Sequence, residues 1–254
     1  GAWGLWTASA EADAVGARYV VQYRLGARAA GYPLPAEMLD EANVALRTLA
    51  SSGYEDLYHL RLRGWAIYLL TRQREITTNA LASVQETLQK RFPDGWKTDL
   101  ASLYLASSWK LLKADDEAER LLQPSWQALS KNYDKSWWTQ NYYDPLVTDA
   151  TRLYLIVRHF PEKVDAIPPQ VLENMVQALR EERYTTFSSA MSILALESYA
   201  GQVAKQNAVQ SLGIEQLNGD AQGAQRISAV AGLFSQGTFS SAARAIRFSN
   251  PNAA

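Results

Sequence analysis

The stretch Thr98-Asp99-Leu100-Ala101-Ser102-Leu103-Tyr104-Leu105 returns in outline as Thr148-Asp149-Ala150-Thr151-Arg152-Leu153-Tyr154-Leu155. Related helix starts stand at Glu11, Glu55 and Thr186. The starts recur about every 44 residues, a period that is typical of stacked helical hairpins. The repeat therefore predicts an all-α protein before any single residue is weighed.

Two kinds of helix alternate along the chain. The odd-numbered segments are rich in Ala, Leu and Tyr with few charges, and the even-numbered ones are amphipathic. An inner helix contacts neighbours nearly all round, whereas an outer helix faces water on one side. The alternation predicts an α/α toroid or solenoid with an inner and an outer ring, and periodicity alone does not separate the closed form from the open one. The nine predicted helices cover about 10–30, 36–50, 55–72, 79–91, 98–113, 115–129, 145–160, 169–182 and 186–204.

Proline and a change of composition mark two breaks. Pro124 is expected to kink or end the sixth helix, because it donates no backbone hydrogen bond. After about Lys205, Gly, Ser, Gln and Asn increase, and 227–234 and 243–248 have the pattern of short strands. We divide the chain into an α/α-toroid domain over 1–205 and a linker with the first strands of a β domain over 206–254. Because two strands alone are marginally stable, they should lie against the toroid or belong to a neighbouring domain.

Composition excludes several classes. Of 254 residues 47% are apolar, the net charge is -1, and charges of both signs are interspersed, so nucleic acid is not an expected partner. No apolar run reaches the roughly 18 residues needed to span a bilayer. The chain starts without a signal peptide, and both ends resemble cuts from a longer chain. With no Cys, there is no disulfide and no thiolate nucleophile.

Carboxylates at the starts of the inner helices are the first candidates for chemistry. In a ring they would gather near one mouth, where some α/α barrels hold the acid and base of a glycosidase. We favour the alternative that they cap helices, because every repeat has one whereas a catalytic pair would single out two. Asp115-Asp116-Glu117 resembles a diphosphate-metal motif, but it opens an outer helix where acidic residues stabilise the dipole. The six carboxylates are Asp13, Glu55, Asp56, Asp99, Asp144 and Asp149.

The chain has two histidines, His59 and His159, and their spacing does not fit a zinc site. His159 ends a predicted helix, where a charged imidazole would favour the dipole. His59 stands at helical spacing from Asp56 and Arg63, in a polar cluster expected at the surface. No phosphate-binding or dinucleotide motif is present, so we predict no metal and no cofactor.

Several segments occur in a characteristic order: Gly1–Trp6 followed by Arg28–Pro35, then 144–161, then 187–200. In this order they resemble the thioester-containing domain of bacterial alpha-2-macroglobulins, over most of 1–205. The tail, with 232–234 and 245–248, resembles the passage into the adjoining CUB-like β domain. The resemblance implies an α/α toroid, in agreement with the repeat.

The resemblance also implies a function. The family consists of large periplasmic protease traps, commonly lipoproteins of the inner membrane associated with peptidoglycan synthesis proteins. A protease cuts a bait region, and a Cys–Gln thioester can then acylate the attacker. The family's Cys-x-x-Gln lies upstream of the Gly-x-Trp-Gly motif with which this chain starts, so no thioester residue is assigned here. We therefore predict a non-catalytic domain of a macroglobulin-like protease inhibitor, whose partners are proteases and other domains of the parent chain.

Aromatic residues are the candidate interface under this interpretation. Two other functions remain open: an α/α-toroid enzyme acting on polysaccharide or isoprenoid, and a helical-repeat scaffold that binds proteins. The high Trp content agrees with each of them, since Trp can line a sugar site or a protein interface. The candidate interface residues are Trp3, Trp6, Trp137, Trp138, Tyr142 and Tyr143.

Overall fold

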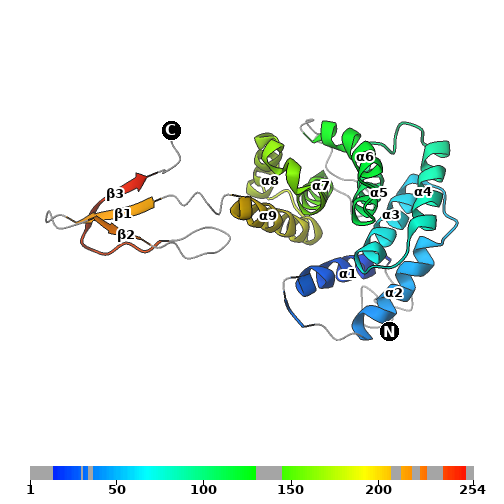
Figure 1. Ribbon diagram of the computed structural model, residues 1–254, viewed down its shortest axis with the longest axis horizontal. Helices are drawn as coiled ribbons and strands as arrows, with labels where there is room; N and C mark the ends of the chain where they lie inside the picture. The colour runs from blue at the N-terminus through cyan, green and yellow to red at the C-terminus, as the bar shows by residue number, and fades with distance from the viewer. Residues whose placement is uncertain are drawn as a thin grey trace.

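A computed structural model describes residues 14–29, 31–33, 37–129, 145–206, 213–218, 224–227 and 237–249 (Figure 1). An all-α repeat with a short C-terminal β segment is confirmed. The six-residue 3-10 turn η1 (Pro161–Ala166) was not expected. The helices are α1 (Ala14–Ala29), α2 (Glu37–Ala50), α3 (Leu57–Arg72), α4 (Thr78–Arg91), α5 (Leu100–Leu111), α6 (Asp115–Ala128), α7 (Pro145–His159), α8 (Pro169–Arg180) and α9 (Thr186–Gln206).

Burial separates an inner layer of helices from an outer one. In the inner layer α3 packs on α5, α5 on α7 and α7 on α9, while α4, α6 and α8 each pack on the odd-numbered helix before them (Figure 1). Helix α5 is buried without interruption from Leu100 to Ser108. Helix α4 buries only Leu81, Val84 and Leu88, a single stripe at helical spacing.

The first and last helices of the inner layer also contact each other. The ring of Tyr19 on α1 lies edge-on to that of Phe187 on α9, with centroids 4.7 Å apart. One turn further along, the amide of Gln22 lies 3.7 Å from the sulfur of Met191. The inner layer therefore curves far enough for α1 to meet α9.

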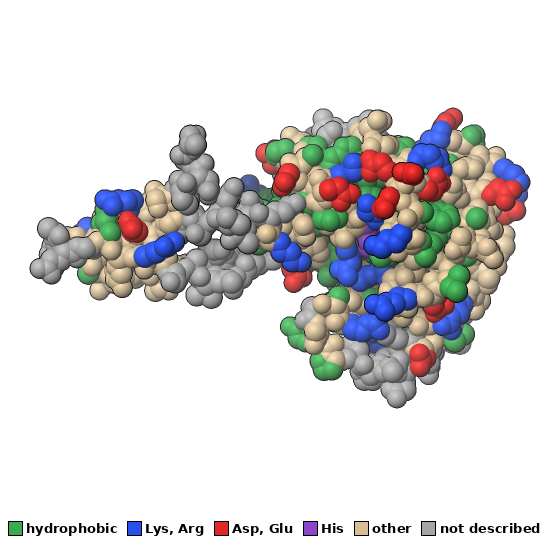
Figure 2. All heavy atoms as spheres, viewed as in Figure 1, with side chains coloured by type: hydrophobic (Ala, Val, Ile, Leu, Met, Phe, Trp, Pro, Cys, Tyr) green, Lys and Arg blue, Asp and Glu red, His purple; other side chains and the backbone are tan. Residues whose placement is uncertain are grey.

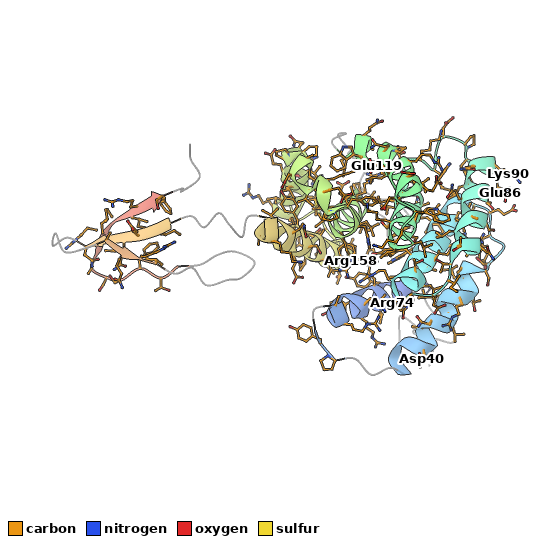
Figure 3. The ribbon with its side chains drawn as sticks, in the orientation of Figure 1. Asp40, Arg74, Glu86, Lys90, Glu119 and Arg158 are labelled. Carbon is orange, nitrogen blue, oxygen red and sulfur yellow. The ribbon has the colours of Figure 1, made fainter. Side chains whose placement is uncertain are left out.

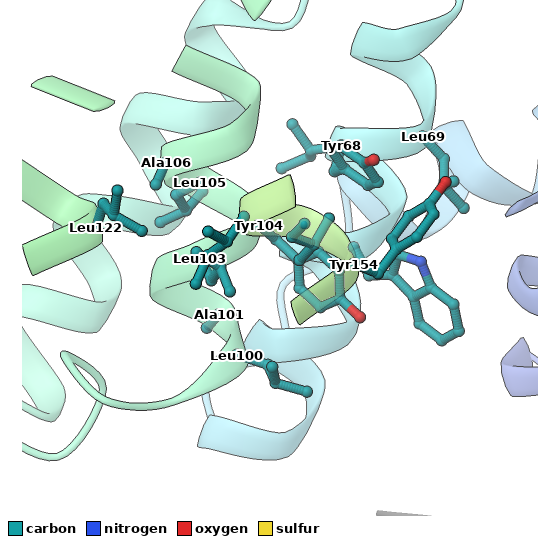
Figure 4. Packing of buried hydrophobic residues seen from close by; sticks show 14 of the residues in the cluster. Tyr68, Leu69, Leu100, Ala101, Leu103, Tyr104, Leu105, Ala106, Leu122 and Tyr154 are labelled. Atoms are coloured by element: carbon teal, nitrogen blue, oxygen red, sulfur yellow. The ribbon is translucent and has the colours of Figure 1, made fainter. Parts of the chain in front are cut away.

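Aromatic side chains fill the centre of the inner layer (Figure 4). The ring of Tyr104 on α5 stacks on Trp65 at 5.9 Å and lies 5.8 Å from Tyr68, both on α3. Gly64 on α3 also faces α5, where an added Cβ would lie 3.7 Å from the Cβ of Tyr104, an ordinary contact distance. Among the described helices, none combines the length and the apolar character that crossing a membrane requires.

Pro124 does not end the sixth helix, because α6 continues through it to Ala128, while the alternative of a kink stays a prediction. Proline removes one backbone donor from the helix. The neighbouring Leu121, Leu122 and Ser125 are buried. This packing stabilises α6 across the missing hydrogen bond, since most helical stability in proteins comes from tertiary contacts.

The β segment is a three-stranded antiparallel sheet with the order β2-β1-β3, made of β1 (Gly213–Asn218), β2 (Ala224–Arg226) and β3 (Ala243–Ser249). The strand predicted at 243–248 is confirmed as β3. The strand predicted at 227–234 is wrong at Ile227, which follows β2, and the rest of that range lies outside the described residues. Figure 1 shows the sheet set apart from the helices.

Strand β1 was missed, and its position was assigned to a linker. The reason is Gln216, a buried amide at the centre of the sheet where a strand pattern would have an apolar residue. Its nitrogen donates to Ser240 Oγ at 2.9 Å and to Gln225 Oε1 at 3.0 Å, and its oxygen accepts from the Ser240 amide. A fully hydrogen-bonded glutamine can be buried at little cost, but it hides the alternation of a strand.

Candidate functional site

The predicted aromatic interface lies outside the described residues. So do Asp13 and Asp144, two of the six carboxylates at helix starts. Of the candidates that the structure describes, Asp56 and Asp99 lie at the N-terminal ends of inner helices and His159 lies at a C-terminal end. The interface residues concerned are Trp3, Trp6, Trp137, Trp138, Tyr142 and Tyr143.

At the N-terminal ends of the inner helices, Asp99 is a helix cap held by an arginine. Its Oδ1 accepts from the Ala101 backbone amide at 2.8 Å, which caps α5 as predicted. The same carboxylate binds the Arg61 guanidinium from α3 through both oxygens, and Arg61 Nε lies 2.8 Å from Oδ1. Such two-point pairing fixes the orientation of both groups. Asp56 caps α3 in the same way, through the His59 amide at 3.0 Å.

Asp149 does not cap a helix, and that prediction is wrong. Helix α7 begins at Pro145, so Asp149 lies in its second turn and is 4% exposed. Its Oδ1 lies 3.5 Å from Arg152 and makes no hydrogen bond among the described residues. Burial raises the pKa of Asp149 to about 7, and the nearby Arg152 only partly offsets this effect.

Two arginines and two carboxyl groups form one mostly buried cluster, made of Arg61, Asp99, Asp149 and Arg152. Arg152 connects its two halves, since it donates to the Thr98 carbonyl at 2.7 Å beside the cap. A carboxyl with a pKa near 7 is suited to general acid-base catalysis. However, at 4% exposure Asp149 has almost no surface that a substrate could touch. The geometry supports a structural role for this cluster.

At the C-terminal ends of the inner helices, His159 is buried against Tyr68. Its Nε2 lies 2.8 Å from the Tyr68 hydroxyl, and the two rings are perpendicular. Burial lowers the pKa of His159 well below its ordinary value, and the positive charges of Arg72 and Arg158 lower it further. A favourable interaction with the helix dipole was expected if the imidazole is charged, and the lowered pKa disfavours that charge. The buried contact with Tyr68 agrees with a structural role for His159.

A cavity of about 860 Å³ opens next to this histidine. Its walls come from the C-terminal halves of α1 and α7, from α9, from Tyr32 just after α1, and from Leu111 of α5. Its position between α1 and α7 was not predicted, because helical periodicity does not show where two helices diverge. The polar and aromatic residues of its wall are Tyr23, Tyr32, Tyr154, Arg158, His159, Glu197, Ser198, Gln202 and Lys205.

Two further candidates, His59 and Asp115, each pair with an oppositely charged or hydrogen-bonding side chain at the surface. His59 Nδ1 lies 2.7 Å from Asp56 Oδ2, in the exposed cluster that was predicted, while Arg63 instead turns inward to the Ala50 carbonyl at 3.3 Å. Asp115 pairs with Lys110 at 2.9 Å. Within the described part of the chain, no group of three His, Asp or Glu side chains could hold a metal ion.

Comparison with known proteins shows the family of the chain. No protein-family model matches it. It is 61% identical over 253 residues to an alpha-2-macroglobulin homolog of Yersinia pestis, which covers 98% of this chain and 13% of that protein. It is 34% identical over 210 residues to alpha-2-macroglobulin of Pasteurella multocida, covering 80% of this chain and 11% of that protein.

The fold agrees with solved structures from Escherichia coli. Native alpha-2-macroglobulin seen by cryo-electron microscopy superposes with a TM-score of 0.61 at 16% identity, over 93% of this chain and 14% of that one. The same protein activated by porcine elastase gives 0.57 at 18% identity, over 98% of this chain and 20% of that one. The layered helices and the small sheet thus have the fold of one part of a much longer solved protein. The chain belongs to the bacterial alpha-2-macroglobulin family, and spans about an eighth of the length of the relative that it matches at 61% identity.

Proposed function

We propose that this chain is a non-catalytic domain of a bacterial macroglobulin-like protease inhibitor. The observation that carries the proposal is the 61% identity to an alpha-2-macroglobulin homolog over 98% of the chain. The chain spans only 13% of that protein, so inhibition would be an activity of the whole molecule, to which this domain contributes a rigid helical body. Its partners would be proteases and the other domains of the parent chain.

Within that molecule, the helical part is proposed to be the α/α toroid of a thioester-containing domain, with no thioester residue in this chain. The two layers of helices and the contact of Tyr19 with Phe187 support a closed ring. The three strands would be the start of an adjoining CUB-like domain. The exposure of β3 supports this, since 63% of Phe248 is open to solvent and a neighbouring layer would cover it.

A non-enzymatic role agrees with the state of the carboxylates. Asp99 is engaged by Arg61, and Asp149 is buried beside Arg152. The sequence resemblance adds a periplasmic location, a parent anchored to the inner membrane as a lipoprotein, and an association with peptidoglycan synthesis proteins. These are proposals that follow from the family.

The experiment uses the full-length parent and porcine elastase, the protease that activates the Escherichia coli protein. Cleavage of casein and of a small chromogenic peptide is measured before and after mixing. A trap should protect casein while the small peptide is still cleaved. If elastase degrades casein at its original rate in a molar excess of the parent, the proposal is wrong.

A second arm distinguishes a covalent trap from one that acts by enclosure. The parent is treated with methylamine and mapped by mass spectrometry. An adduct on a Gln with release of a free thiol would indicate a thioester elsewhere in the parent. Protection of casein without an adduct would indicate enclosure alone.

A further inference from the structure

Arg152 on α7 lies between two acceptors and donates a hydrogen bond to only one of them. Its Nη2 donates to the carbonyl of Thr98 at 2.7 Å, directly before the Asp99 cap of α5. Its Nη1 lies 3.5 Å from Asp149 Oδ1, which is too far for a good hydrogen bond. The contact with Thr98 joins two inner helices, whereas a closer contact with Asp149 would stay within α7.

Two buried atoms of the pair formed by Asp149 and Arg152 lack a hydrogen bond. Within the described part of the chain, Asp149 Oδ1 and Arg152 Nε have no partner, and their side chains are 6% and 11% exposed. Residues three apart on a helix are neighbours on its surface. A turn of the guanidinium toward Asp149 would pair these atoms in the two-point geometry that suits arginine and carboxylate, at the loss of the bond to Thr98.

The proton on Asp149 decides between these two arrangements. A protonated carboxyl group is neutral, so it leaves Arg152 to the carbonyl of Thr98. A buried carboxylate, in contrast, requires a paired cation. Burial raises the pKa of Asp149 to about 7, with Arg152 only partly offsetting it, and the long distance between the two groups fits the protonated form.

Other charges near Asp149 leave this choice to the pair. Within the described residues, Arg152 is the charged group that acts on Asp149, and Arg152 in turn is close to Asp99 and Arg61, which bind each other. On the elements packed against α7, Glu197 and Lys205 line the cavity at its opposite end, Glu162 and Lys163 pair with Lys110 and Glu119, Arg183 pairs with Glu181, and Asp165, Glu173 and Arg180 are exposed.

An ion pair at the surface does not have this property. Figure 2 shows acidic and basic side chains next to each other on the outside of the helical part. Glu86 and Lys90 of α4 are one such pair, 2.6 Å apart and 65% and 73% exposed (Figure 3). Water can replace either partner there, so a change of protonation leaves no atom unpaired. Asp149 and Arg152 are shielded from water, and only a rearrangement within the protein can satisfy them.

We propose that Arg152 is a pH-dependent latch between α7 and the start of α5, which holds the Thr98 carbonyl while Asp149 carries its proton and turns to Asp149 when that proton passes to water. The latch is engaged in acid and is released as the pH rises through neutrality. Asp99 stays paired with Arg61, so the cap of α5 remains and the release is confined to the connection with α7. This device would operate whatever the function of the parent chain.

The test is hydrogen exchange of the full 254-residue chain, followed by mass spectrometry of segment 97–102. The quantity measured is the protection factor, the exchange rate of an unstructured peptide divided by the observed rate. The unsubstituted chain and Asp149→Asn are compared at about pH 5.5 and about pH 8.5. Asn cannot ionise and keeps the latch engaged. At the higher pH the segment should therefore be at least about tenfold less protected in the unsubstituted chain, and at the lower pH the two should agree.

Segment 65–70 in the core of α3 is the internal reference, because ionisation of Asp149 also changes the global stability. A change of protection by the same factor in both segments would mean that Asp149 acts on global stability alone, and would overturn the proposal. Equal protection of 97–102 in the two proteins at both pH values, or lower protection in Asp149→Asn at the higher pH, would overturn it as well.

Two more variants test the role of Arg152. Arg152→Gln removes the latch, so segment 97–102 should be poorly protected at both pH values, with circular dichroism to verify the fold. Glu86→Gln is the matched control for Asp149→Asn, since it neutralises the carboxylate of an exposed ion pair and should leave the protection of 97–102 as in the unsubstituted chain. If Arg152→Gln protects this segment at about pH 5.5 as well as the unsubstituted chain does, Arg152 is no latch.

Discussion

The hydroxyl of Tyr68 lies 2.8 Å from Nε2 of His159, and this hydrogen bond joins α3 to α7 across 91 residues of sequence. Both groups are neutral. Burial raises the pKa of Tyr68 and lowers that of His159, so neither side chain ionises near neutral pH. The pair fixes the inner helices beside the cavity without placing a charge in the core.

Tyr68→Phe should lower the free energy of unfolding by about 1–3 kcal/mol, because the buried imidazole nitrogen is left without its partner. The measurement is urea unfolding followed by circular dichroism. Tyr184→Phe is the control, since Tyr184 is 46% exposed and loss of its hydroxyl should change stability by less than about 0.5 kcal/mol. Equal effects of the two changes would contradict the structure.

The free energy of unfolding of the Asp149→Asn variant should increase relative to that of the unsubstituted chain as the pH rises. The pKa of Asp149 is 3.8 in an unfolded chain and about 7 in the folded one, so the folded state binds its proton more tightly. The stabilisation from Asp149 is then complete below pH 3.8 and is lost as the pH rises to 7. Asn does not titrate and keeps the shape of the protonated acid.

The free energy difference between these two proteins should therefore change by up to about 1.4 kcal/mol per pH unit between pH 4 and pH 7. Above pH 7 it should level off. The measurement is urea unfolding of both proteins at intervals across this range. A difference that stays constant from pH 4 to pH 8 would show that the carboxyl of Asp149 titrates as in an unfolded chain.

The caps Asp56 and Asp99 should differ in their contribution to stability. Asp56→Ala removes an exposed cap and should cost about 1 kcal/mol. Asp99→Ala also removes the two-point pairing with Arg61, of whose side chain only 19% is exposed, so it should cost about 3 kcal/mol. Thermal unfolding of both variants measures this difference. Equal losses would mean that Arg61 contributes nothing through Asp99.

Gly64→Ala should stabilise the protein by about 0.5–1 kcal/mol, because alanine restricts the unfolded chain and suits a helix interior better than glycine. The new methyl group would lie 3.7 Å from the Cβ of Tyr104 and 3.8 Å from the Ala101 carbonyl, which are ordinary contacts. Gly64→Val is the companion variant and should destabilise, since its branches would press against α5. A fall in melting temperature with Gly64→Ala would mean that α3 and α5 pack more closely than described.

Local signals in the sequence were enough to predict the helices. The apolar spacing of Leu81, Val84 and Leu88 marks one face of α4, and the polar residue before Leu100 marks the start of α5. Both signals come from residues within one or two turns of each other. The same reasoning gave a wrong prediction for Asp149. Its motif resembles that of Asp99, but α7 starts one turn earlier, at Pro145.

The candidate site was less predictable. The sequence suggested that His159 would favour the helix dipole if it were charged, but burial against Tyr68 lowers its pKa and disfavours the charge. Nothing near Arg72 or Arg158 in the sequence shows that the two guanidiniums share Tyr154 as a neighbour.

The sequence by itself determined that the chain forms helical hairpins, where each helix lies, and to which family it belongs. These properties depend on residues close together in the chain or on a pattern kept in order along it. The tertiary structure decided which groups are charged and which residues meet: the neutral pair of Tyr68 and His159, the buried Asp149, and the cavity between α1 and α7. Desolvation and packing between helices far apart in the sequence control these features, and neither can be read from one segment alone.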